Sequence, residues 1–152
     1  MISPLLIVFD RSRTFLEVFA RGPEWLTLFG KFPAANNTAS NSRGPWPAGL
    51  YRSERLVRLP PGDDDPNGPY GAWFLRFIVP DRDGLDDAVG EFDGPGIGMG
   101  LHAGRRDGVD ALGRSGYLRA TMGCVRTTDE AMSTIAAGFG EAGGSCHLVV
   151  LD

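Results

Sequence analysis

Apolar residues alternate with polar ones in several short runs, which is the pattern of half-buried β-strands. The runs PLLIVFD and TFLEVFA, on either side of the polar RSR, predict a β-hairpin at the start of the chain. EWLTLFGKF predicts a third strand after the breakers Gly22 and Pro23. Further strands are predicted over LYRSERLVRLP, AWFLRFIVP, GIGMGLHAG and SCHLVVL.

One segment, TTDEAMSTIAAGF, has the 3.6-residue periodicity of an amphipathic helix. Thr127 and Glu130 have the spacing of a capping box, which predicts where the helix begins. Four glycines predict its end: Gly138, Gly140, Gly143 and Gly144. Its apolar face is predicted to consist of Ala131, Met132, Ile135, Ala136 and Phe139. We therefore expect a mostly β fold with one or two helices, in a single domain over residues 1–152.

Charge and hydropathy limit what the chain binds. The 152 residues carry a net charge of −4 and a pI near 5.1, which gives no general attraction to nucleic acid. No run approaches the roughly 18 apolar residues of a membrane span. The N-terminal MISPLLIVFD lacks the basic region and cleavage site of a secretory signal. We expect no nucleic-acid partner and no membrane span.

Charged clusters suggest two further kinds of site. Asp63, Asp64 and Asp65 could offer oxygen ligands to a hard cation, but no other ligand follows at a recognisable spacing, so we expect no metal and no cofactor. Positive charge gathers at Arg105, Arg106, Arg114, Arg119 and Arg126. These arginines are interpreted either as part of a solvated loop or as a site for substrate carboxylates, which guanidinium groups bind well.

The candidate chemistry lies between Gly96 and Arg126, where one of two histidines and one of two cysteines are 22 positions apart. Glycines alternate before His102, so this side chain is predicted to point from a bare strand face into open space. Cys124 is predicted to lie just before the helix N-terminus, where the macrodipole favours a thiolate. A histidine in reach can take the thiol proton, so the pair predicts a nucleophile with its base. A buried structural cysteine and histidine are the alternative.

The second pair, Cys146 and His147, is adjacent in sequence. Neighbouring strand residues point to opposite sides, so the two cannot act as nucleophile and base and are interpreted as structural. A disulfide between Cys124 and Cys146 is conceivable, but it would consume the proposed nucleophile.

The segments LHAG and TMGCVR, joined by a basic, glycine-containing loop, resemble the catalytic motif of YkuD-type L,D-transpeptidases, which remodel bacterial peptidoglycan. Matching positions are His102, Thr121, Gly123, Cys124 and Arg126, whereas Met122 stands where most members have a second histidine. A second matching segment, GPWPAGLYR, carries Pro47, Gly49 and Tyr51 before an expected edge strand. The resemblance implies an L,D-transpeptidase-like mixed β-sandwich and one catalytic domain over residues 1–152.

The resemblance also implies the chemistry. Cys124, deprotonated by His102, would attack a peptidoglycan stem tetrapeptide to form a thioester, which an amine or water resolves. The N–H groups of Gly123 and Cys124 would stabilise the oxyanion. The carbonyl of Ala103 would orient the base, and carbapenems would acylate the thiol. Substrate-binding positions would be Arg126, Thr121, Tyr117 and Met122, with Tyr117 in a flap formed by residues 105–119.

Other functions stay open at this point. A secreted antibacterial effector of the same fold, with an immunity protein as partner, would fit the N-terminus. A catalytically inactive wall-binding domain would fit Met122. A papain-like amidase is disfavoured, because there the cysteine precedes its histidine. In each wall-directed case the chain would act in the periplasm or cell wall, by an export route that the sequence does not indicate.

Overall fold

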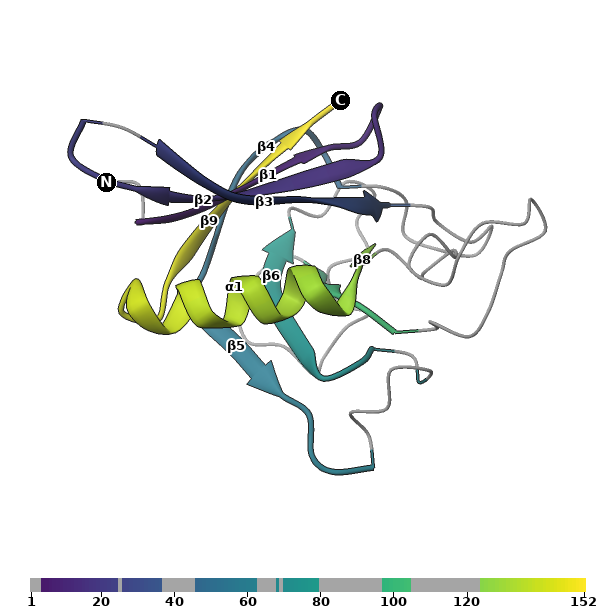
Figure 1. The fold of residues 1–152 in the computed structure, drawn as a ribbon. Coiled ribbons are helices and arrows are strands. Elements are labelled where there is room, and N and C mark those ends of the chain that lie inside the picture. Colours follow the sequence, from purple (N-terminus) through teal and green to yellow (C-terminus); the bar gives the residue numbers. More distant parts are fainter. Residues whose placement is uncertain are drawn as a thin grey trace.

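Within the residues that the structure describes, nine strands form a mixed sheet, which is the frame of the fold (Figure 1). The computed structural model describes residues 4–24, 26–36, 46–62, 68, 70–79, 97–104 and 124–152. In chain order the elements are β1 (Leu5–Asp10), β2 (Phe15–Arg21), β3 (Leu26–Ala35), β4 (Gly49–Ser53), β5 (Arg55–Arg58), β6 (Trp73–Val79), β7 (Ile97–His102), β8 (Val125–Thr127), α1 (Asp129–Glu141) and β9 (Cys146–Leu151). The order across the sheet is β4-β9-β1-β2-β3-β8-β7-β6-β5.

The N-terminal hairpin and the third strand are confirmed. β1 and β2 pair antiparallel, and β2 pairs antiparallel with β3. Leu5, Ile7 and Phe9 are buried while the residues between them are only half-buried, so the alternation in the sequence selects the core face. β9 adds to β1 in parallel, which makes the sheet mixed.

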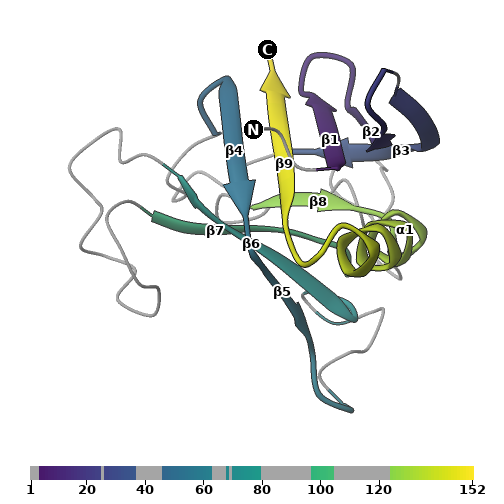
Figure 2. The same ribbon diagram turned by 90° about the vertical axis from the view of Figure 1, so that its left-hand side faces the viewer.

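The segment from Gly49 to Arg58 corrects one prediction, since it forms two strands where the sequence predicted one. β4 pairs with β9 at one end of the sheet, and β5 pairs with β6 at the other. Only Glu54 separates them, so the chain passes from one end of the sheet to the other within one residue. The Ser53 hydroxyl donates to the carbonyl of Arg76 on β6. The sheet is thereby bent until its two ends meet, and Figure 2 shows β5, β6 and β7 crossing beneath β4, β9 and β1.

The predicted helix is confirmed, but its predicted cap is wrong, and of the four glycines predicted to end it only Gly143 and Gly144, both at positive φ, lie beyond its last residue. The residue that caps α1 is Thr128, whose hydroxyl accepts from the N–H of Ala131. Thr127 is fully buried in β8 and donates to the carbonyl of Pro33, so it is not available as a cap. The helix continues through Gly138 and Gly140 to Glu141.

α1 packs on the concave side of the sheet. Its buried residues Ala131, Met132, Ile135 and Phe139 join the core formed by the strands. The predicted fold class, mostly β with one or two helices, is confirmed, with α1 as the one helix among the residues described. In this part of the chain no helix has the length and hydropathy of a membrane span.

Candidate active site

β7 and β8 bring His102 and Cys124 to one face of the sheet. The strands are parallel, with Leu101 opposite Val125 and His102 opposite Arg126, so Gly100 comes opposite Cys124. The N–H of Gly100 donates a hydrogen bond to the Cys124 thiol. Cys124 directly precedes β8, and continuing the strand geometry by one residue puts it on the same face as His102, with Cβ atoms about 8 Å apart for standard strand spacing and rise.

His102 does not point into open space, so that prediction is wrong. Its side chain is 1% exposed, and Phe74 on β6 stacks on the imidazole with ring centroids 5.7 Å apart and an interplanar angle of 12°. Tyr70 meets the same ring edge-on at 5.0 Å. Phe74 is the register partner of His102, and its ring also lies over Gly100. The bare glycine face predicted from the sequence is therefore filled by an aromatic ring from the neighbouring strand.

The backbone of Ala103 fixes the tautomer of His102. The Nδ1 atom lies 2.7 Å from the Ala103 carbonyl, which can only accept, so Nδ1 carries the proton. The N–H of Ala103 donates in turn to the carbonyl of Tyr70 at 3.1 Å. The remaining ring nitrogen, Nε2, keeps its lone pair and can accept a proton from a thiol.

Burial favours the neutral forms of both His102 and Cys124. Burial, with a smaller contribution from the charge of Arg126, lowers the pKa of His102 to about 3, although the hydrogen bond to the Ala103 carbonyl acts to raise it. Burial likewise raises the pKa of the Cys124 thiol to about 11, although the Gly100 N–H and Arg126 act to lower it. A nucleophilic role for this thiol therefore requires a base that removes its proton during the reaction.

The prediction that the helix dipole favours a thiolate at Cys124 is also wrong. β8 lies between Cys124 and α1, which begins at Asp129. Dipole effects fall off within the first turn of a helix, so this N-terminus is too remote to favour a thiolate. Arg126, which is 5% exposed on β8, is the positive group that acts on both Cys124 and His102.

Part of the predicted site lies outside the residues described. The predicted positions there are Gly123, Thr121, Tyr117 and Met122, together with Arg105, Arg106, Arg114, Arg119 and the acids Asp63, Asp64 and Asp65. His102, Ala103, Cys124 and Arg126 are described, and the structure brings them together. Among the residues described, no cluster of three or more His, Cys, Asp or Glu is suited to a metal.

Three described residues of this region were not predicted from the sequence. Phe74 and Tyr70 enclose the imidazole, and Asn36 donates from Nδ2 to the carbonyl of Cys124 at 3.1 Å. Phe74 could have been found by pairing AWFLRFIVP against GIGMGLHAG, since an antiparallel register brings an aromatic residue beside the histidine. No sequence signal pointed to Asn36, which lies in a run of polar loop residues.

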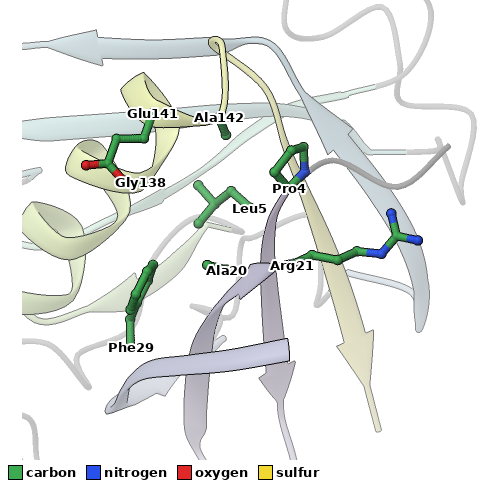
Figure 3. A pocket seen from close by; sticks show the side chains of 8 residues that line it. All are labelled: Pro4, Leu5, Ala20, Arg21, Phe29, Gly138, Glu141 and Ala142. Atoms are coloured by element: carbon green, nitrogen blue, oxygen red, sulfur yellow. The ribbon is translucent and has the colours of Figure 1, made fainter. Parts of the chain in front are cut away.

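A shallow cleft elsewhere shares no residue with this site. It lies where the end of α1 meets the sheet, with a volume of about 150 Å³, and Phe29 and Leu5 form part of its wall (Figure 3). That volume is below the roughly 300 Å³ at which ligand pockets begin. This cleft is too small for a stem peptide.

Gly100 offers a test of the packing around His102. A Cβ at this position would overlap the Phe74 ring, so Gly100→Ala is expected to lower the free energy of unfolding by about 1–3 kcal/mol, the usual cost of overpacking. Gly140→Ala is the matched control, because nothing lies within 4 Å of its Cβ position on α1. The free energy of unfolding of Gly140→Ala should rise by about 0.5–1 kcal/mol, because alanine favours the helix more than glycine does. Urea unfolding of both variants measures the contrast, and equal stabilities would contradict the packing described.

Comparisons with known proteins bear on the fold. No protein-family model matches the sequence, and no curated protein matches it. The structure of Bdellovibrio bacteriovorus Bd1075 is similar over 99% of this chain and 49% of its own, with a TM-score of 0.62 and 24% identity. The helical cell shape determining protein Pgp2 from Campylobacter jejuni is similar over 98% of this chain and 48% of its own, with a TM-score of 0.55 and 19% identity. L,D-transpeptidase 1 of Mycobacterium tuberculosis aligns with a TM-score of 0.46 at 15% identity, over 99% of this chain and 63% of its own.

The likeness to the first two structures shows that this chain has their fold. The chain spans about half the length of each of them.

Proposed function

We propose that this chain is a peptidoglycan-modifying cysteine acyltransferase, an L,D-transpeptidase or L,D-carboxypeptidase that acts on stem tetrapeptides. The observation that carries the proposal is the placement of the Cys124 thiol and the His102 imidazole on one face of β7 and β8, with Nδ1 bonded to Ala103. That hydrogen bond leaves Nε2 as the base. The fold shared with a protein named for determining helical cell shape agrees with an action on the cell wall.

The proposed reaction begins with proton transfer from the Cys124 thiol to Nε2 of His102. The sulfur attacks the carbonyl carbon of the third stem residue, and the amide bond to the terminal D-alanine breaks. D-alanine leaves as the amine and takes the proton from His102, so a thioester remains on Cys124. Water then gives the tripeptide, or an amine acceptor gives a crosslinked or exchanged stem.

Burial keeps both groups in the forms from which the first step starts, a neutral thiol and a neutral imidazole. A neutral imidazole can accept a proton, and the pKa of His102 near 3 keeps it neutral at physiological pH. The imidazolium formed during attack is unstable in that buried position, which favours rapid return of the proton to the leaving amine. Arg126 carries a positive charge close to both groups and is proposed to bind a substrate carboxylate.

The remaining parts of the proposal concern segments outside the residues described. The N–H groups of Gly123 and Cys124 are proposed as oxyanion donors, and Thr121, Tyr117 and Met122 as substrate contacts. The chain is proposed to act as one catalytic domain in the periplasm or cell wall.

The direct assay uses purified disaccharide tetrapeptide, analysed by liquid chromatography and mass spectrometry. Incubation with the protein is expected to yield the tripeptide and free D-alanine, or a crosslinked product when an amine acceptor is added. The ratio of these products identifies the acceptor. Failure to process tetrapeptides with or without an added amine would contradict the proposed function.

A further inference from the structure

Asn36 lies buried directly after β3, and its amide joins two distant parts of the chain. Its side chain is 7% exposed. Nδ2 donates to the carbonyl of Cys124 at 3.1 Å, and Oδ1 accepts from the N–H of Trp46 at 2.8 Å. Because one partner is an acceptor and the other a donor, the orientation of the amide is fixed by its neighbours. Asn36 therefore links the candidate nucleophile to the segment that begins at Trp46.

The Trp46 end of this link is held firmly. Trp46 is 1% exposed, and its ring packs against Phe77 and Tyr51 with centroids 5.4 Å away in both cases. Its carbonyl accepts from Arg11 at 2.5 Å, and the Tyr51 hydroxyl donates to the carbonyl of Pro47 at 2.6 Å. An amide anchored to such a segment presents Nδ2 at a defined position.

At the other end, the amide restrains the backbone of Cys124 directly. The Cys124 carbonyl is held by Asn36, and its sulfur is held by the N–H of Gly100. Arg126, two residues later, pairs with Ala35 on β3 and His102 on β7. Rotation of the Cys124 carbonyl would swing the side chain relative to β7, so the bond from Asn36 selects the orientation in which the sulfur faces the strand that carries His102.

We propose that Asn36 is a positioning residue for the nucleophile, which fixes Cys124 through its carbonyl and couples that geometry to the packing of Trp46. This inference rests on the proposed thiol chemistry. A misplacement of about 1 Å at a reacting group can cost on the order of 10²-fold in rate.

Two variants separate the two hydrogen bonds. Asn36→Asp keeps an acceptor for the N–H of Trp46 and loses the donor to Cys124, whereas Asn36→Ala loses both. At pH 8 both are expected to lower kcat on the tetrapeptide about 10²-fold, with a much smaller change in KM. A wild-type kcat in folded Asn36→Asp would overturn the proposal, because the bond to Cys124 would then be dispensable.

Thr127→Val is the matched control. It also removes a part-buried hydrogen bond from a side chain to a backbone carbonyl, at 2.8 Å, between β8 and β3, the strands that Cys124 and Asn36 adjoin. It should lower the free energy of unfolding by about 1–3 kcal/mol while kcat stays near that of the parent. If Thr127→Val lowers kcat as much as the Asn36 variants do, general weakening of the β3–β8 junction explains the loss and the positioning role is wrong.

Alkylation of the thiol tests the proposal without the wall substrate. In a Cys146→Ala background, the rate of reaction of Cys124 with iodoacetamide is followed from pH 6 to 11 under native conditions. Asn36→Ala is expected to react faster than its parent at pH 8, with its profile displaced by at least about one pH unit to lower pH, because a sulfur released from its contacts gains solvent. An unchanged profile would overturn the positioning role. If the two alkylation profiles differ as expected but the Cys146→Ala parent does not process tetrapeptide, the positioning role stands and only the proposed function is refuted.

Discussion

A Cys124→Ala variant is expected to release D-alanine from stem tetrapeptides on the order of 10⁶-fold more slowly than the native chain, as when other enzymes lose their nucleophile. The thioester needs the sulfur, and alanine leaves Nε2 of His102 with no thiol proton to accept. Chromatography of the products measures this loss. Cys124 is only half-buried, so its truncation should leave the fold intact.

The other cysteine supplies the matched control. Cys146 is fully buried on β9, its sulfur accepts from the backbone of Ser53, and burial raises the pKa of its thiol to about 12. Cys146→Ala should cost about 1–2 kcal/mol of stability through the small cavity that it leaves, with turnover unchanged. Retained turnover in Cys124→Ala, or an equal loss in folded Cys146→Ala, would contradict the assignment of the nucleophile.

Acidification is expected to destabilise the chain strongly through His102. Its pKa is lowered from 6.5 in the unfolded chain to about 3 in the fold, so the associated stability is present above pH 6.5 and is lost as pH falls toward 3. At about 1.36 kcal/mol for each pKa unit, the whole difference corresponds to roughly 5 kcal/mol. Urea unfolding at pH 7, 5.5 and 4.5 should show this decline.

His102→Asn isolates the contribution of the imidazole. Asparagine can place an amide N–H near the position of Nδ1, where it can donate to Ala103, but it does not titrate. For each pH unit below 6, the free energy of unfolding of the variant should fall by about 1.4 kcal/mol less than that of the native chain. Carboxylates such as Asp10 and the other histidine, His147, contribute to both proteins and cancel in the comparison. Parallel stability curves would show that His102 is not buried in neutral form.

The alternation of apolar residues predicted most of the described strands because it reflects which face of each strand is buried. The pattern failed at Glu54, because the apolar residues Leu50, Leu56 and Val57 predicted one strand where the structure has β4 and β5. A bend that sends neighbouring residues to opposite ends of a sheet depends on long-range pairing with β9 and β6, which leaves no local pattern. The helix cap was predicted one residue too early for a similar reason. Thr127 belongs to β8, and its hydroxyl bonds to the carbonyl of Pro33 on β3.

The sequence predicted which of the described side chains lie together at the candidate site, but not which residues enclose them. Residue type and spacing identified His102 and Cys124, and the resemblance to the L,D-transpeptidase motif added Arg126; the parallel pairing of β7 and β8 brings the three together. The burial of His102 comes from Phe74 and Tyr70, whose positions depend on strand register. Burial then reverses the expectation of a ready-made thiolate, because desolvation outweighs Arg126 at Cys124.

The central claim is that the sulfur of Cys124 carries the acyl group. Its most direct test is intact-protein mass spectrometry after acid quenching of a reaction with disaccharide tetrapeptide, followed by peptide mapping. The account predicts a mass gain equal to the tetrapeptide muropeptide minus D-alanine, located on Cys124 in the native chain and in Cys146→Ala, and absent from Cys124→Ala. Product formation without this adduct, or an adduct on another residue, would contradict it.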